Sequence, residues 1–328
     1  MVRVGLVGCG IISGMHLDAW AQVGEQARVV SVADIDPERA AAAAERSGAR
    51  AVEVEALLAD PEIDAVDLTL PHHLHRDYTE RAFAAAKHVL CQKPIAHTLD
   101  DADAMIAASQ AAERTLVIAE ATRYDALVPK ARELVDSGAI GRPLAVQVSM
   151  NWWQGGEYLQ TPWRFDVGLM GGGALVDGGI HYVDYLLHYA GLPVEVSCFT
   201  RRVREAYAGE DLAFVQARHA DGLLSALAIS ASSRHTPSYP LRVWGDEGSV
   251  IAERGRLVLR RERGEEETFE LQHSGMLGPI RDFLACLATG GRPLSGGPEA
   301  WANLAYVHAA YDSAETGRVV RLDSPPTG

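Results

Sequence analysis

A glycine-rich turn between an apolar strand and a helix constrains the fold of this chain more than any other sequence feature. Residues 2–7 form an apolar run, and residues 8–13 then read GCGIIS before a helical pattern begins. Gly8 permits a tight turn, Gly10 lets the backbone approach a pyrophosphate, and the amides at the helix start supply donors. Ser13 replaces the usual third glycine of this dinucleotide-binding fingerprint but is also small. The expected cofactor contacts in this turn are Gly8, Gly10, Ile11 and Ile12.

A second predicted strand ends in an acidic residue that selects the cofactor. Residues 28–33 read as a strand, and Asp34 ends it about 26 residues after Gly8, near the spacing at which a carboxylate meets the adenosine ribose. A carboxylate accepts hydrogen bonds from ribose hydroxyls but repels the 2′-phosphate of NADP, and Ile35 offers that phosphate nothing. We therefore expect NAD rather than NADP. Arg39 is the alternative phosphate ligand, although a solvated helix charge is its more ordinary role.

Strands alternate with helices up to about residue 120, which predicts a doubly wound parallel sheet. The further predicted strands are residues 64–70, 88–91 and 115–119, and the predicted helices are residues 37–46, 76–86 and 99–112. Thr98 is expected to cap the last of these helices, with Asp101 three residues on.

A histidine-rich loop follows the third strand. Its residues 71–75 read PHHLH, and ligands bind at the carboxyl edge of an open parallel sheet. We expect the loop to line the nicotinamide edge, with His75 near the start of the next helix. Three histidines in four residues also raise the question of a metal, but no fourth ligand with zinc-site spacing lies nearby, so we expect none. The expected cofactor contacts at this edge are Thr69, Pro71, His72, His75 and Lys93.

Lys93 is the first candidate for chemistry. The apolar strand 88–91 leads into Gln92-Lys93-Pro94. Pro94 biases Lys93 towards an extended conformation and withholds one backbone donor, so the strand stops with its lysine at the carboxyl edge of the sheet. An ordinary surface lysine that ends a strand is the plain alternative, and this stretch alone does not separate the two.

After about residue 121 the pattern becomes rich in strands. The strand-like runs are residues 143–150, 194–203, 211–217, 223–231, 239–243 and 256–259. Short polar turns join several of them, which predicts an antiparallel sheet with flanking helices. We therefore divide the chain into an NAD-binding domain, residues 1–121, and a substrate-binding and oligomerisation domain, residues 122–328.

Half of the six tryptophans fall in one loop of the second domain, at positions 152, 153 and 163. Tryptophan in a glycine-rich polar loop is costly without a partner, and a carbohydrate or cyclitol ring is a suitable one. Core packing or a subunit contact is the alternative. Arg164 is the only arginine of the loop and Asp166 is close to it, so a neutral or cationic polyol is expected rather than a sugar phosphate. The expected substrate contacts are Trp152, Trp163, Arg164, Asp177 and His181.

Asp177 and His181 lie four residues apart on a predicted helix with an apolar period, so they are expected to share one face. A carboxylate beside an imidazole fixes its tautomer and raises its basicity, which a proton-transferring histidine requires. A buried satisfied pair and metal ligation are the alternatives. Five glycines surround the pair, and because glycine destabilises a helix start they count against a purely structural role.

Composition narrows the class of partner. The chain has 328 residues, a formal net charge of −14 and a pI near 5.3, which argue against nucleic acid or an anionic membrane as partner. No apolar run approaches the roughly 18 residues that span a bilayer. Four scattered cysteines, without a CxxC pair or a signal-like segment, favour the reducing cytoplasm. We expect a small-molecule partner.

Three motifs together carry a resemblance to a known family. They are the glycine turn, the segment HVLCQKP at residues 88–94, and GGGALVDGGIHYVD at residues 171–184. The chain resembles the Gfo/Idh/MocA oxidoreductases over nearly its whole length. The resemblance implies an α/β fold with an amino-terminal Rossmann domain and a carboxyl-terminal domain built on a large, mostly antiparallel sheet. It also implies oxidation or reduction of a sugar or cyclitol carbon, with a catalytic set of Lys93, Asp177 and His181.

One position departs from the family. Where the family usually reads Glu-Lys-Pro, this chain has Gln92, and loss of a carboxylate disfavours the ammonium form of Lys93 if the two side chains interact. Two other functions stay open: an NAD-dependent glycosidase that oxidises transiently and eliminates, and a non-catalytic NAD-binding regulator. The strand at residues 223–231 is expected to have Leu227 and Ile229 on one face and Ala226 and Ala228 on the other. One face is expected to pack on helices and the other on a second subunit, giving a homodimer or homotetramer, with a monomer as the alternative.

Overall fold

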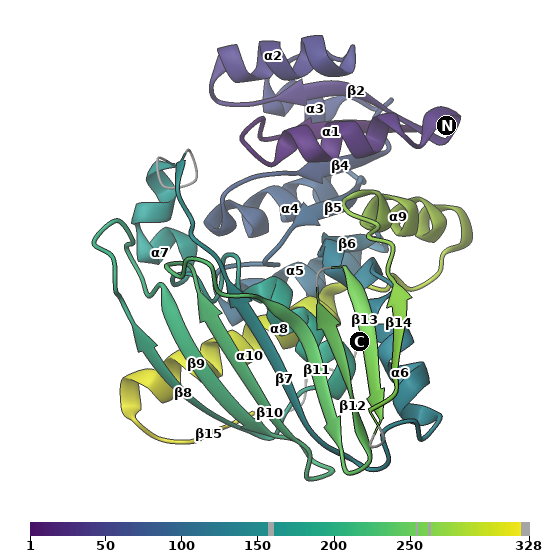
Figure 1. Cartoon of the computed structure of the whole chain (residues 1–328). Helices are drawn as coiled ribbons and strands as arrows, with labels where there is room; N and C mark the ends of the chain where they lie inside the picture. The colour runs from purple at the N-terminus through teal and green to yellow at the C-terminus, as the bar shows by residue number, and fades with distance from the viewer. Residues whose placement is uncertain (157–160, 254, 262–263, 323–328) are drawn as a thin grey trace. The chain divides into compact units, whose positions relative to one another are not determined.

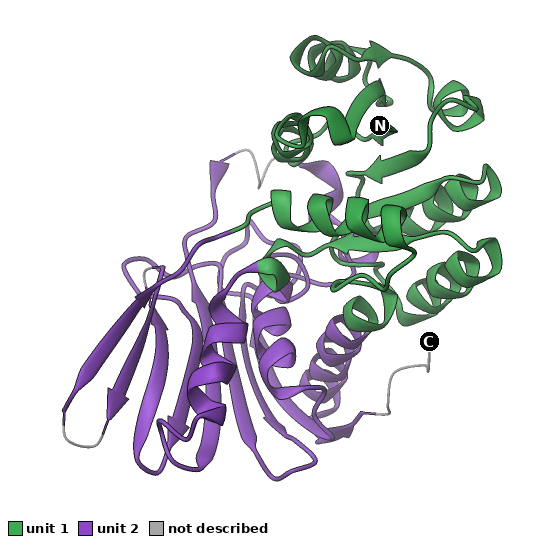
Figure 2. Ribbon diagram, turned by 90° about the vertical axis from the view of Figure 1, so that its right-hand side faces the viewer, with its two compact units in different colours: residues 1–124, 274–301, 327–328 green, residues 125–273, 302–326 purple. Residues whose placement is uncertain are grey.

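The computed structural model of the chain describes residues 1–156, 161–253, 255–261 and 264–322 (Figure 1). It divides into two compact units, shown in different colours in Figure 2. Unit 1 contains Met1–Tyr124 and Ser274–Trp301, and unit 2 contains Asp125–His273 and residues 302–322.

Unit 1 is built on a six-stranded sheet in which every pairing is parallel, as the sequence predicted. Its strands are β1 (Val2–Val7), β2 (Ala27–Ala33), β3 (Arg50–Ala51), β4 (Ala65–Leu68), β5 (His88–Gln92) and β6 (Leu116–Ala119). Their order in the sheet is β3-β2-β1-β4-β5-β6. The chain order reverses at β1, so the carboxyl ends of β1 and β4 form the switch point at which such sheets bind ligands.

Two of the described helices of unit 1, α2 and α5, begin at a residue whose side chain caps them. The helices of this unit are α1 (Ser13–Ala21), α2 (Pro37–Ser47), α3 (Val54–Ala59), α4 (His75–Ala84), α5 (Leu99–Ala112) and α9 (Leu277–Thr289), with the 3₁₀ turns η1 (Gly24–Gln26), η2 (His72–Leu74) and η3 (Ala121–Tyr124). The Thr98 side chain accepts a hydrogen bond from the amide of Asp101, which confirms the predicted cap of α5. Asp36 caps α2 in the same way. The short elements α3 and β3 were not predicted.

Helix α9 shows that unit 1 is not a continuous stretch of chain. Its Phe283 is fully buried and meets the ring of Trp20 edge-on, with 6.4 Å between the ring centres. Ile280 belongs to the same apolar core as the first strands. The predicted division assigned residues 274–301 to the second domain, 122–328. In the structure they pack with the first unit, because the apolar face of α9 contributes to its core.

Unit 2 is built on a nine-stranded, mostly antiparallel sheet, as expected. Its strands are β7 (Pro143–Asn151), β8 (Glu195–Arg201), β9 (Leu212–Arg218), β10 (Leu224–Ser230), β11 (Tyr239–Gly245), β12 (Gly248–Glu253), β13 (Arg256–Arg261), β14 (Glu266–Glu270) and β15 (Val320–Arg321). The order is β14-β13-β12-β11-β7-β10-β9-β8-β15, and only β7 and β10 pair in parallel. Strands β12, β14 and β15 were not predicted. The described helical segments are α6 (Leu127–Asp136), η5 (Pro162–Phe165), α7 (Val167–Met170), α8 (Ile180–Ala190) and α10 (Gly297–Thr316), which begins in unit 1.

The two faces of this sheet differ in their covering. Helix α8 packs on β7, β10 and β11, and Leu227 and Ile229 of β10 are buried, as predicted. The opposite face is open, because alternate residues of β9 are exposed. Phe214 on that face is 54% exposed and lies opposite Phe199 of β8, which is 77% exposed.

Three further features bear on the expected partners. None of the helices in the described part of the chain combines the length and apolarity that crossing a bilayer demands. The described residues also contain no cluster of three or more His, Cys, Asp or Glu side chains suited to a metal ion. All four cysteines are free and buried. The compartment stays a prediction.

Candidate active site

The glycine turn has the space and the donors that a dinucleotide needs. Gly8 has φ = +95°, and a Cβ atom there would lie 2.7 Å from the carbonyl oxygen of Thr69, so only glycine fits. A Cβ atom on Gly10 would meet nothing within 4 Å, which leaves that side of the turn open. The Ser13 hydroxyl donates to the carbonyl of Gly10 at 2.7 Å and closes the turn. The residues present therefore fit a pyrophosphate at the start of α1.

Asp34 lies directly beside this turn. Its carboxylate accepts hydrogen bonds from the amides of Cys9 at 2.6 Å and Asp36 at 2.8 Å. These bonds orient the carboxylate where β2 ends, and its remaining lone pairs are available to hydroxyl donors. Burial and the nearby Asp34 raise the pKa of the Cys9 thiol to about 12, so the thiol stays neutral near an anionic group. Arg39 pairs with Asp36 at 3.3 Å on the exposed surface of α2.

Side chains after β4 form hydrogen bonds at the carboxyl edge of the sheet. The Thr69 hydroxyl donates to the carbonyl of Gly8. His75 is fully buried, with its two ring nitrogens 2.9 Å from the carbonyl oxygens of Pro94 and Leu70. Burial lowers the pKa of this imidazole. The ring of His75 thus joins the loops after β4 and β5, while its predicted contact with a cofactor stays a prediction, as do the contacts of Thr69, Pro71 and His72.

Lys93 follows β5 directly and is 8% exposed. It is therefore not an ordinary surface lysine. Its backbone amide donates to the side-chain oxygen of Gln92 at 2.6 Å, and the Gln92 amide nitrogen lies 3.1 Å from His16 Nε2. Gln92 thus contacts the backbone of Lys93. The sequence did not predict this contact. Lys93 belongs to unit 1, whereas Asp177 and His181 belong to unit 2.

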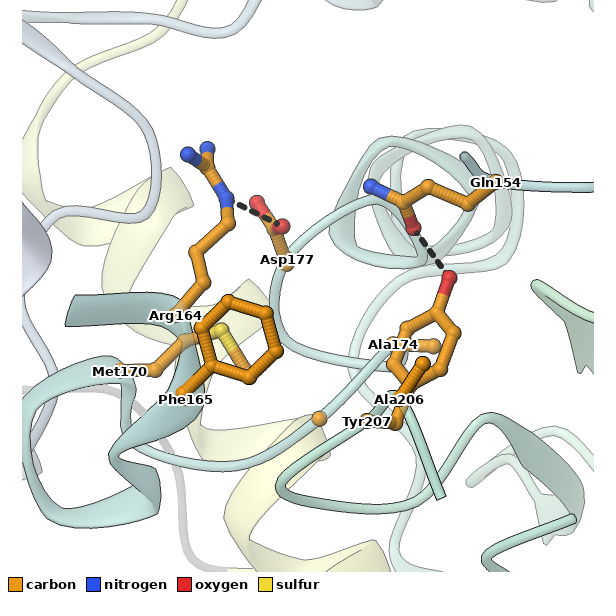
Figure 3. A pocket seen from close by; sticks show the side chains of 9 residues that line it. Gln154, Arg164, Phe165, Met170, Ala174, Asp177, Ala206 and Tyr207 are labelled. Atoms are coloured by element: carbon orange, nitrogen blue, oxygen red, sulfur yellow. Dashed lines mark hydrogen bonds and ion pairs between the residues drawn. The ribbon is translucent and has the colours of Figure 1, made fainter. Parts of the chain in front are cut away.

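Unit 2 contains a small pocket that is partly open to solvent (Figure 3). Its lining residues are Gln154, Arg164, Phe165, Met170, Gly173, Ala174, Asp177, Ala206 and Tyr207. On one side, Arg164 Nε donates to the Asp177 carboxylate at 3.1 Å, and the guanidinium lies 4.3 Å from the ring centre of Trp163. On the other side, the Tyr207 hydroxyl donates to the Gln154 side chain at 2.8 Å. The pocket therefore combines hydrogen-bonded polar groups with the apolar side chains of Phe165 and Met170.

The predicted helix through Asp177 and His181 begins later than expected. Helix α8 starts at Ile180, so His181 lies in its first turn and Asp177 lies in the turn before it. The prediction that both residues lie on one helix was wrong. A Cβ atom at Gly178, between these two residues, would lie 2.7 Å from the indole of Trp152, so only glycine fits there.

Glu210 and Tyr311 hold the glycine-rich segment that precedes Asp177. The Glu210 carboxylate accepts from the amide of Leu175 at 2.9 Å, and its backbone carbonyl accepts from Ala174 at 2.7 Å. A Cβ atom on Gly173 would lie 2.1 Å from the Glu210 carbonyl oxygen. The glycines are therefore needed for close backbone approach. Sequence patterns did not point to Glu210, Tyr311, Gln154 or Tyr207, since each is far from the motifs or lacks a recognisable spacing.

Comparison with known proteins identifies the family. Residues 2–120 match the model of an oxidoreductase family with an NAD-binding Rossmann fold, and residues 128–251 match the GFO/IDH/MocA C-terminal domain. The chain is 32% identical to a D-apiose dehydrogenase of Paraburkholderia graminis, over 97% of this chain and 89% of the relative. This chain belongs to the Gfo/Idh/MocA oxidoreductase family. It is an NAD(P)-dependent dehydrogenase.

Two further Gfo/Idh/MocA relatives match along their whole length. A myo-inositol 2-dehydrogenase of Thermotoga maritima is 25% identical, over 98% of this chain and 99% of the relative. The crystal structure of an aldose-aldose oxidoreductase from Caulobacter crescentus, complexed with glycerol, has a TM-score of 0.87 at 27% identity and covers 98% of this chain and 99% of that chain. The family membership confirms the resemblance and the predicted fold class.

Proposed function

We propose that this enzyme transfers hydride between a ring carbon of a sugar, amino sugar or cyclitol and the nicotinamide of NAD. The pocket of unit 2 carries this proposal. It combines the polar side chains of Arg164, Asp177, Gln154 and Tyr207, which can form hydrogen bonds with hydroxyl groups, with apolar side chains, a combination that suits a polyol. The named activities of the relatives, which act on D-apiose and myo-inositol, support the same substrate class.

The glycine turn, Asp34 and the loop after β4 are the residues that would hold the cofactor. NAD is favoured over NADP because Asp34 presents a carboxylate where a 2′-phosphate would lie. Ile35 is 96% exposed and offers no hydrogen bond, and Arg39 is already paired with Asp36. When bound, NAD supplies the hydride acceptor.

Three side chains have separate roles in the proposed proton transfer. His181 takes the proton from the substrate hydroxyl as general base, and Asp177 orients its imidazole. Lys93 donates to the same oxygen and stabilises the charge that develops on it. The bond from Asp177 to Arg164 leaves further lone pairs on the carboxylate for the imidazole.

A neutral or cationic polyol fits the pocket better than a sugar phosphate. The Arg164 guanidinium is 17% exposed and compensated by Asp177, so its charge is not available for a second anion. Arg204 is engaged elsewhere, because it donates to the carbonyl of Gln154 at 2.8 Å and lies over the Trp153 ring. Trp152 and Trp163 are not among the lining residues of the pocket, so their stacking against the apolar face of a sugar stays a prediction.

The open face of the nine-stranded sheet is the proposed contact with a second subunit. Phe214 lies between Phe199 of β8 and Ala228 of β10 in the sheet register, and exposed apolar residues gathered in this way mark an interface. A homodimer or homotetramer would cover them.

A substrate screen tests the function. Inositols, free sugars and amino sugars are incubated with NAD, and the absorbance of reduced nicotinamide is followed. We expect one of these classes to give NADH in amounts that match oxidised product. Cleavage of an aryl glycoside without net NADH would instead favour the glycosidase, and no absorbance change across the screen would favour a non-catalytic regulator.

A further inference from the structure

A buried chain of hydrogen bonds in unit 1 joins the first turns of α1 to Lys93. Asp67 and His16 are both 0% exposed, and Gln92 is 6% exposed. Asp67 accepts from Trp20 Nε1 at 2.7 Å and lies 2.9 Å from His16 Nδ1. His16 Nε2 lies 3.1 Å from the Gln92 amide nitrogen, and the Gln92 oxygen accepts from the Lys93 amide at 2.6 Å.

Groups that can only donate determine the direction of every bond in this chain. The backbone N–H of Lys93 must donate, so the Gln92 atom that faces it is the oxygen. The Gln92 NH₂ group then faces His16 Nε2 and donates to it, which makes that nitrogen an acceptor. The proton of a neutral His16 therefore lies on Nδ1, from which it is donated to Asp67.

A carboxamide is the side chain that completes this pattern at position 92. A carboxylate there would still accept from the Lys93 amide but has no hydrogen to donate to His16 Nε2. Two acceptors would then face each other in a buried site unless His16 gained a proton. The same chain links three elements, since His16 lies on α1, Asp67 on β4 and Gln92 on β5.

We propose that Gln92 is a positioning residue whose amide holds His16 as its Nδ1–H tautomer and fixes the backbone of Lys93 at the end of β5. The catalytic part of this inference rests on the proposed role of Lys93. The tautomer assignment is independent of that role, because it follows from the hydrogen bonds alone. Since α1 begins at the glycine turn, Gln92 also connects Lys93 to the helix that would receive the pyrophosphate.

The first test is the tautomer of His16 in the wild-type chain. Nitrogen-15 histidine spectra at pH 7.5 are recorded for the wild type and for His16→Gln, and the signal lost in the variant is that of His16. We expect a neutral ring with its proton on Nδ1. An Nε2–H tautomer or a doubly protonated ring would overturn the proposal, whether or not a substrate has been found.

The second test is Gln92→Glu, with the exposed Gln110→Glu as the matched control. We expect both His16 nitrogens to be protonated in Gln92→Glu and the signal to be unchanged in the control. Because the carboxylate still accepts from the Lys93 amide, Gln92→Glu tests the tautomer alone, and a neutral His16 in this variant would overturn the tautomer assignment. Gln92→Met removes both bonds at similar length and tests the positioning role. We expect kcat of Gln92→Met to fall at least tenfold, with the KM for NAD changed less than threefold, and a kcat equal to that of the wild type would overturn the positioning role.

Discussion

The Tyr311 hydroxyl donates a hydrogen bond to the Glu210 carboxylate at 2.9 Å, and together these two residues hold the backbone that leads to Asp177. The same hydroxyl accepts from the amides of Gly173 at 3.2 Å and Val176 at 3.3 Å. Desolvation raises the pKa of Glu210 and raises that of Tyr311 well above its ordinary value. Because the Glu210 carboxyl group is easier to protonate in the folded chain than in the unfolded chain, its contribution to stability depends on pH.

Glu210→Gln should remove that sensitivity. Because the folded pKa of Glu210 is raised, the stability that this group contributes is fully present below its ordinary pKa of 4.5 and is lost as the pH rises through the folded value. Glutamine keeps the acceptor for Leu175 and Tyr311 but does not ionise. Urea unfolding between pH 4.5 and 8 should therefore show the wild type losing stability relative to Glu210→Gln as the pH rises. The exposed Glu315→Gln is the control. A difference in the free energy of unfolding between the wild type and Glu210→Gln that did not change with pH would contradict this prediction.

His181→Ala and Lys93→Ala should each lower kcat by about 100-fold or more, the size expected for general acid–base catalysis. Their combination should cost less than the product of the two single effects, since both are proposed to act on one hydroxyl oxygen. Steady-state kinetics with the substrate found in the screen measures this. His273→Ala and Lys130→Ala, outside the proposed site, serve as controls. A loss smaller than tenfold in either single variant would not fit the mechanism.

Asp34→Ala should narrow the preference for NAD over NADP by roughly tenfold, because it removes the repulsion of a 2′-phosphate. The ratio of kcat/KM for the two cofactors is the measurement. Glu38→Ala, at the exposed start of α2, should leave that ratio unchanged. A wild-type enzyme that uses NADP as efficiently as NAD would reject the ribose assignment and point to Arg39.

Trp163→Ala should raise the KM for the substrate about threefold to tenfold while leaving cofactor affinity nearly unchanged, as expected for loss of an aromatic contact. The variant also removes the ring over which Arg164 lies. Trp244→Ala, in β11 of the same unit, is the matched control. The polyol assignment would fail if a phosphorylated sugar were turned over much more efficiently than its neutral parent.

Phe214→Glu should break the proposed subunit contact, because it places a charge between Phe199 and Ala228 on the open face of the sheet. Light scattering at micromolar concentration should give a multiple of the chain mass for the wild type and a single chain mass for the variant. Leu294→Glu, an equally drastic change at an exposed site of unit 1, should not alter the mass. A wild type with one chain mass would reject the oligomer.

The sequence by itself determined the elements whose signals are local. The turn at Gly8, the cap at Thr98 and the apolar runs of the parallel sheet each depend on neighbouring residues, so their positions were predicted to within a few residues. The family followed from motifs of the same local kind. The identities of Lys93, Asp177 and His181 as candidates came from those motifs too, and their catalytic roles remain predictions.

Only the tertiary structure decided which distant residues meet. The return of Phe283 to the core around Trp20, the pairing of Arg164 with Asp177, and the contact between Gln92 and His16 each join parts of the chain without a shared spacing. The start of α8 at Ile180 also depends on tertiary contacts, because the backbone amides of Leu175 and Val176 donate to Glu210 and Tyr311 and not to a preceding helical turn. Propensity and periodicity describe neighbours in sequence, whereas packing and hydrogen bonding select partners in space.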